Sequence, residues 1–537
     1  MLFRSVLLVS FVCYFCIQAS KTKTSQKCIT SLRTLSARVS HVPWVVPNNA
    51  ENYSSTSTIC DFSEPMFEDC CAVSPIQFGS TSNPPELEQL RIQWLEPVSA
   101  ALLNHSLYLQ RYFIECLNLT MAALDVSFQS SYGYNYQNNK EFFVHFFDDL
   151  ESYMLGYRQN LSQMVDNFFD ELLKRIVRLL WFAKSQDDLV IADCISAELQ
   201  QHSPFGRIPE GIKRMAIRAF PPARMTANAL LVGSETISNA LNEVNLVYSC
   251  HINWMKLRYC KFCFGEPLAS ICPDDCQQQI TLCMNDYYSL DDPWTHFIDS
   301  LLELINRLRG SDSFPQVNRP LQIHITDAIM SFQRLFSRID PTLLKKCGYS
   351  RRNTNTTRSR QRRHLYSVER GIFSSVPETV DYFRVLPSLE NQTKLMRNEY
   401  LSVRSLFSNL EKSFCSPQLL HYPDYSGKSV YTCWNGNRMS STRLTSNRPK
   451  PQPTKPNPVI QRLSIRLQAT THLLQTVLND NADPDFVPLE DSQFIDRLHS
   501  LWDRESKKRL SNPTSTSPSL DAKVPNEYFS GVSNPSI

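Results

Sequence analysis

Six cysteines lie between positions 250 and 283 of this chain, and their density is its first sign of chemistry. They are Cys250, Cys260, Cys263, Cys272, Cys276 and Cys283. Thiols this close together bind a metal ion, carry out redox chemistry or form disulfides. The compartment that the chain enters decides among these three uses.

The N-terminus predicts entry into the secretory pathway. Arg4 precedes an almost continuously apolar run, Val6 to Ile17, and the small residues Ala19 and Ser20 follow it. These features are typical of a secretory signal peptide, which we place at residues 1–20. A membrane span needs about 20 apolar residues, so this run is too short to anchor the chain. In an oxidising compartment, the cysteines beyond the signal peptide should form disulfides.

Two other interpretations of the cluster stay open. Cys260 and Cys263 have the C-x-x-C spacing of thiol–disulfide enzymes, but no βαβ pattern surrounds them. Adding Cys272 and Cys276 would give a four-thiolate zinc site. Structural disulfides are favoured over both, because the chain is predicted to be secreted and nearly all its cysteines can be paired.

Other motifs for chemistry are missing from the sequence. It has no nucleophile elbow, glycine-rich phosphate loop or H-E-x-x-H motif, and its 11 histidines do not cluster. We therefore predict no enzyme activity, no catalytic residue, no cofactor and no metal site. A net charge of +3 is too small to imply a nucleic-acid partner.

The elements that must hold these cysteines are predicted to be helices. Only 13 of 537 residues are glycine, against a usual share of about 7%, which disfavours barrels and sandwiches. Apolar residues recur at steps of three and four, with phenylalanine pairs at 142–143, 146–147 and 168–169. We expect helices that begin near 84, 141, 212, 295, 376 and 459, with the apolar pattern of the second repeated at 168–180. The helix that begins near 212 should be interrupted near Pro221 and Pro222.

The sequence also predicts the order of segments behind the signal peptide. Residues 21–440 form a cysteine-rich helical core, in which 350–364 is an exposed basic loop. Residues 441–458 are a proline-rich linker, 459–503 a C-terminal helical segment and 504–537 a disordered polar tail.

Within the basic loop, Arg360, Arg362 and Arg363 form a basic-x-basic-basic motif. Secretory convertases have acidic clefts and cut such sites, so we predict cleavage after Arg363. A heparin-binding patch is the alternative, which could coexist with cleavage, and a merely solvated run of charges is a third interpretation. The chain also carries N-x-S/T sequons, which become candidate glycosylation sites behind a signal peptide. These lie at Asn52, Asn104, Asn118, Asn160, Asn355 and Asn391.

Taken together, the cysteine motifs resemble those of the glypicans, a family of cell-surface heparan sulfate proteoglycans. The resemblance covers roughly residues 27–486. It rests on Cys60 with Cys70-Cys71, on Cys194 with Ser203-Pro204-Phe205-Gly206 and Arg218-Ala219-Phe220, on Tyr259-Cys260-Lys261-Phe262-Cys263 with Cys272-Pro273-Asp274-Asp275-Cys276 and Cys283, and on Cys433-Trp434-Asn435-Gly436.

The resemblance implies seven disulfides that the sequence alone could not pair. They are Cys28–Cys70, Cys60–Cys260, Cys71–Cys263, Cys194–Cys347, Cys250–Cys283, Cys272–Cys433 and Cys276–Cys415. Cys116 has no counterpart and is predicted to be a buried free thiol or an intermolecular bridge. Two of the pairs, Cys272–Cys433 and Cys276–Cys415, would span the cleavage point and keep the two fragments joined.

The resemblance further implies an all-α, elongated rod with a cysteine-rich N-terminal lobe. Such a core would bind secreted signalling proteins of the Wnt, Hedgehog, BMP and FGF classes and act with their receptors as a co-receptor. Heparan sulfate would be its covalent modification, and the cell surface or extracellular space its location.

Two features depart from the family pattern. The only Ser-Gly outside the core is Ser530-Gly531, so Ser530 is the candidate glycosaminoglycan site. The last residues, Tyr528 to Ile537, lack the apolar tail of a lipid-anchor signal. A membrane attachment would therefore need an anchor that this sequence does not display. The alternative function is a secreted ligand-binding antagonist or carrier without heparan sulfate.

Overall fold

The computed structural model describes residues 45–46, 72–73 and 85–479. Gaps in the last range fall at 158–159, 181–185, 265, 267, 337–345, 349–385, 387, 417–430 and 443–456. The chain divides into two compact units, each built from three separate segments. Unit 1 comprises Met1–Ser99, Glu235–Thr295 and Ser405–Arg466, and unit 2 comprises Ala100–Ser234, His296–Arg404 and Leu467–Ile537. The segment boundaries predicted at 440, 458 and 503 stay predictions.

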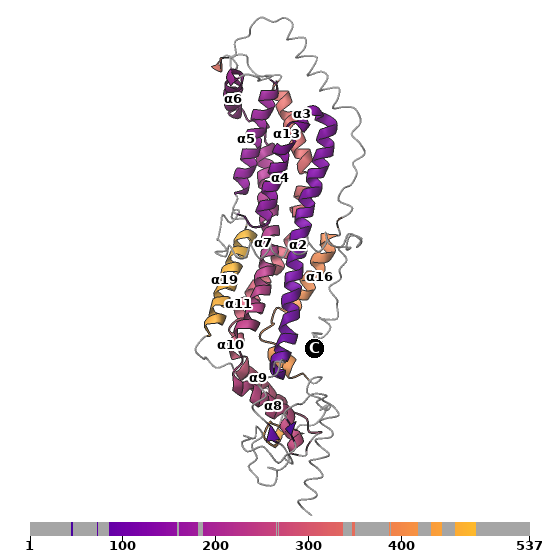
Figure 1. Ribbon diagram of the computed structural model, residues 1–537, viewed down its shortest axis with the longest axis vertical. Helices are drawn as coiled ribbons and strands as arrows, with labels where there is room; N and C mark the ends of the chain where they lie inside the picture. The colour runs from indigo at the N-terminus through magenta and orange to yellow at the C-terminus, as the bar shows by residue number, and fades with distance from the viewer. Residues whose placement is uncertain are drawn as a thin grey trace, which may run out of the picture. The chain divides into compact units, whose positions relative to one another are not determined.

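Helices dominate the described residues, so the predicted all-α class is confirmed (Figure 1). They are α2 (Glu86–Tyr132), α3 (Tyr134–Gln137), α4 (Lys140–Met154), α5 (Leu161–Leu180), α6 (Gln186–Gln200), α7 (Ile208–Glu243), α8 (Tyr248–Cys263), α9 (Pro273–Cys283), α10 (Asn285–Tyr288), α11 (Asp291–Arg307), α12 (Phe314–Asn318), α13 (Leu321–Phe336), α16 (Leu389–Ser402), α17 (Leu410–Phe414) and α19 (Pro458–Leu478). Two antiparallel strand pairs accompany them: β1 (Val45–Val46) with β2 (Ala72–Val73), and β3 (Tyr431–Trp434) with β4 (Met439–Thr442).

The core of unit 2 includes the aromatic stripes that the sequence predicted. Helices α4 and α5 lie side by side (Figure 1), and their phenylalanines interdigitate. The ring of Phe168 lies 4.9 Å from that of Phe142 and 4.1 Å from that of Phe146, centroid to centroid. Aromatic pairs at these distances contribute about 0.5–1.5 kcal/mol beyond their buried area, so this contact helps to fix the α4–α5 pair.

The predicted interruption at Pro221 and Pro222 is wrong, because α7 runs through both prolines. Their missing N–H groups deprive the carbonyls of Ile217 and Arg218 of helical partners. Ile217 is half-buried and Arg218 exposed, so water can bind these carbonyls. Every residue from 219 to 234 is buried. Burial of this continuous segment outweighs the local cost of the prolines.

Unit 1 contains a hairpin that the sequence reasoning missed. Strands β3 and β4 pair from Tyr431 opposite Thr442 to Trp434 opposite Met439. In the connecting loop, Asn435 Oδ1 accepts hydrogen bonds from the backbone N–H groups of Asn437 and Arg438, both at 2.9 Å. The next residue, Gly436, has φ = 102°, a conformation that favours glycine. An Asn-Gly pair between short strands was the available signal.

Candidate functional site

In unit 1, three disulfides hold α9 to its neighbours. Cys250–Cys283 links α8 to the end of α9, and Cys276–Cys415 links α9 to the residue after α17. Cys272, the residue before α9, is joined to Cys433 of β3. A fourth disulfide, Cys194–Cys347, lies in unit 2. These four pairs coincide with four of the seven that the resemblance implies.

The strand β3 is also bound through its backbone. Trp434 N–H donates to the Ser270 carbonyl at 2.7 Å, and Cys272 N–H donates to the Trp434 carbonyl at 2.9 Å. The buried Trp434 indole donates to the carbonyl of Lys256 in α8 at 3.1 Å. The hairpin therefore ties together α8 and the segment that leads into α9. Five of the six clustered cysteines are disulfide-bonded, and bonded sulfurs offer no thiolate for redox attack or zinc binding.

Several predicted site residues lie outside the described residues. They are Cys28, Cys60, Cys70 and Cys71, the sequons Asn52 and Asn355, the convertase residues Arg360, Arg362 and Arg363, and Ser530. Cys263 ends α8, but its side chain is not described. Cys260 is disulfide-bonded. The three remaining disulfides, the cleavage point and the glycosaminoglycan site stay predictions.

The odd cysteine is buried. Cys116 has no exposed area and is a free thiol within unit 2, and burial raises its pKa to about 12. Its carbonyl accepts hydrogen bonds from Thr120 and from the buried amide of Asn318. A protonated thiol without solvent access is unreactive, so the structure agrees with the buried alternative.

Four sequon asparagines fall on described residues, and all four are exposed: Asn104, Asn118, Asn160 and Asn391. Asn104 and Asn118 lie within α2, and Asn391 lies in the first turn of α16. Asn160 instead precedes α5. Exposure leaves room for a glycan at each position, although whether any of them is modified stays a prediction.

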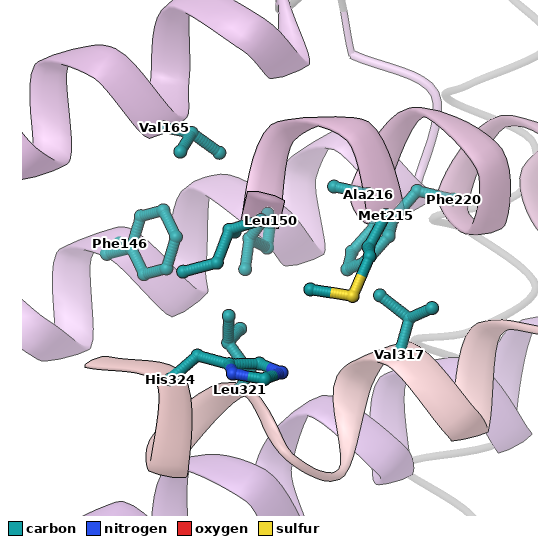
Figure 2. A pocket seen from close by; sticks show the side chains of 10 residues that line it. Phe146, Leu150, Val165, Met215, Ala216, Phe220, Val317, Leu321 and His324 are labelled. Atoms are coloured by element: carbon teal, nitrogen blue, oxygen red, sulfur yellow. The ribbon is translucent and has the colours of Figure 1, made fainter. Parts of the chain in front are cut away.

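Sequence reasoning did not find the apolar cavity inside unit 2. Figure 2 shows side chains from α4, α5, α7, α12 and α13 around it. The lining residues are Phe146, Leu150, Val165, Ile212, Met215, Ala216, Phe220, Val317, Leu321 and His324. Its volume is about 10 Å³, close to the lower limit for one water molecule. Eight of the ten are buried, and Met215 and His324 are the half-buried pair. A ligand could enter only if some of these side chains moved.

A buried ionisable cluster in unit 2 was also missed. His105 Nδ1 lies 2.5 Å from the hydroxyl of Tyr400, and His105 Nε2 lies 3.6 Å from Glu399 Oε2. Burial lowers the pKa of His105 to about 4 and raises the pKa of Glu399 to about 7. The neutral forms of both side chains are therefore favoured. His105 and Tyr400 lie 295 positions apart in the sequence, so spacing along the chain could not reveal this cluster.

Comparison with known proteins decides the family. The family model described as "Glypican" matches residues 8–492, nearly the whole chain. The chain belongs to the glypican family. Glypican-1 from Gallus gallus is 25% identical over 475 residues, which are 86% of this chain and 83% of the relative. Human Glypican-1 is 24% identical over 391 residues, covering 71% and 67%.

Solved glypican structures share the fold. The full-length glypican-1 core protein superposes with a TM-score of 0.61 at 23% identity, covering 74% of this chain and 87% of that one. A Dally-like protein, crystallised in complex with O-palmitoleoyl serine, gives a TM-score of 0.53 at 22% identity, covering 73% and 85%.

Membership of the glypican family supports a heparan sulfate proteoglycan core, and glypicans are cell-surface or extracellular proteins. Within the part of this glypican that the structure describes, no helix is long and apolar enough to span a bilayer. The same part contains no group of three or more His, Cys, Asp or Glu side chains placed to hold a metal ion.

Proposed function

We propose that this glypican binds secreted growth factors or morphogens of the Wnt, Hedgehog, BMP and FGF classes and modulates their signalling as a co-receptor. Heparan sulfate on the core would attract basic ligands over long distances in a salt-dependent way. The protein core would add direct contacts. Attachment at Ser530 and cleavage after Arg363 belong to the same proposal.

The observation that carries the proposal furthest is the apolar cavity of unit 2. A signalling protein that carries a covalent acyl chain would need an apolar site in the core for that chain. The Dally-like protein was crystallised in complex with an acylated serine. Each CH₂ moved from water into an apolar site contributes about 0.8 kcal/mol. We propose that an acyl chain enters between α7 and α13 when the half-buried Met215 and His324 side chains move aside.

A fluorescent palmitoleoyl-serine probe tests this site on the full chain. Ala216→Leu would fill the cavity from α7 and should weaken binding at least about tenfold, which corresponds to about 1.4 kcal/mol. Val165→Ala would enlarge it and should leave binding intact or stronger. Ile323 lies beside His324 but is 54% exposed, so Ile323→Ala serves as the control and should bind as the wild type does.

Thermal unfolding of each variant separates loss of the site from loss of the fold. Binding that survives Ala216→Leu unchanged, or that falls equally in the Ile323→Ala control, would exclude this cavity as the acyl site.

The proteoglycan part of the proposal has a separate test. Heparinase treatment of the product secreted from animal cells should increase its gel mobility. An unchanged mobility would favour the alternative function, a ligand-binding antagonist or carrier without heparan sulfate.

A further inference from the structure

An open groove runs between α4 and α5 on the surface of unit 2. Its volume is about 510 Å³, within the range of small-molecule sites, and it is separate in chemistry from the closed apolar cavity. Aromatic and sulfur-containing side chains form one part of the lining: Phe142, Phe146, Met164 and Phe168. Polar side chains form the other part: His145, Asp149, Asn160, Gln163 and Asn167.

This mixture of surfaces suits a sugar better than a lipid or a peptide helix. A pyranose ring has apolar C–H faces that pack on aromatic rings and hydroxyl groups that bond to polar side chains. The groove offers the half-buried ring of Phe142, which stacks on Phe168 and has the guanidinium carbon of Arg175 5.0 Å from its centroid. Exposed donors and acceptors on His145 and Asn167 lie beside it. A hydrocarbon ligand would leave these polar groups desolvated and unpaired.

One residue of the groove also carries a sequon. Asn160-Leu161-Ser162 begins at the N-terminus of α5, and Asn160 lines the groove. Its Oδ1 accepts a hydrogen bond from the backbone N–H of Gln163 at 2.9 Å. N-glycosylation takes place on Nδ2 and leaves Oδ1 as an acceptor, so this helix cap survives the modification. The cap fixes the amide plane and therefore the direction in which an attached sugar leaves.

We propose that the N-linked glycan of Asn160 lies in the α4–α5 groove, where its first sugar residues pack on Phe142 and bond to the polar rim. The occupant is covalently tethered at the groove itself, so its effective concentration there is high. The other described sequons supply a comparison. Asn391 is also exposed and also lies at the start of a helix, α16.

Native deglycosylation tests the proposal. The full chain is produced in animal cells restricted to high-mannose glycans and treated, folded or denatured, with endoglycosidase H, which cuts between the first two sugars. Peptide mass spectrometry then measures release at each site. For each site, the rate of glycan release from the native protein is divided by the rate from the denatured protein. This ratio should be at least about fivefold lower at Asn160 than at Asn391, because one typical net hydrogen bond already corresponds to that factor.

A double variant supplies the structural readout. His145→Ala with Asn167→Ala removes two exposed rim side chains and should raise the Asn160 ratio toward that of Asn391, while Asn391 itself stays unchanged. An unmodified Asn160 would overturn the proposal. So would equal native accessibility at the two sites, or a double variant in which Asn160 is as protected as before.

Discussion

The buried pair of His105 and Glu399 makes a quantitative prediction for the isosteric substitution Glu399→Gln. Glu399 Oε2 is buried and makes no hydrogen bond in the structure. Burial raises its pKa from 4.5 to about 7, so ionising this side chain in the folded state costs free energy. At about 1.4 kcal/mol per pH unit, that interval corresponds to a cost of up to about 3 kcal/mol.

The sign of the effect follows from proton binding. Because the folded pKa of Glu399 lies above the unfolded value, its contribution to stability is present below pH 4.5 and is lost as the pH rises to about 7. Glu399→Gln should therefore stabilise the protein above pH 7, by about 1–3 kcal/mol, and this advantage should vanish near pH 4.5.

The partner residue gives the opposite slope. Burial lowers the pKa of His105 from 6.5 to about 4, so the folded state loses stability as the pH falls through this interval. In the wild type, the free energy of unfolding falls with rising pH because of Glu399 and rises with pH because of His105, so the two dependences cancel between pH 4.5 and 6.5. The Glu399→Gln variant keeps only the histidine slope, so it should lose about 1.4 kcal/mol per pH unit on acidification through that range.

Urea unfolding between pH 4.5 and 8, followed by near-ultraviolet circular dichroism, measures both effects. Glu390→Gln is the matched control, because Glu390 is exposed on the same helix, where it pairs with Lys394. Such exposed pairs contribute little to stability, because solvent screens the charges. If His105 and Glu399 instead form an ion pair in the folded protein, Glu399→Gln will destabilise it at pH 7. That result would refute the reasoning from burial.

Two further predictions concern unit 1. Gly436→Ala should lower the free energy of unfolding by about 1 kcal/mol in urea titrations, because φ of 102° strains any side-chain-bearing residue; equal stability would contradict this. The second prediction concerns protein that has been cleaved after Arg363. Replacing Cys276 and Cys415 with serine should leave its two fragments joined on non-reducing gels, because the disulfide Cys272–Cys433 also spans the cleavage position. Separation of the fragments in this variant would show that the second disulfide is not formed.

Local patterns were sufficient to predict several of the long helices, but not α6 or α9. The helix predicted to open near 84 agrees with α2, which begins at Glu86. The phenylalanine stripes agree with α4 and α5, and the start near 459 agrees with α19 at Pro458–Leu478. Each of these has an apolar face that repeats at helical spacing, and such a face directs both the local conformation and its burial. The expectation of one helical region from 376 onward was coarser than the structure, which has α16 at Leu389–Ser402 and α17 at Leu410–Phe414.

The sequence by itself determined the all-α class, the aromatic faces of the helices and the positions of the sequons, because these depend on residues that are close along the chain. Only the tertiary structure decided that α7 continues through its two prolines, where burial from 219 to 234 outweighs the local backbone penalty. It alone brought His105 to Glu399 and placed Asn160 on the α4–α5 groove. These relations depend on packing between segments distant in sequence, and the periodicity of a single segment carries no information about its partner.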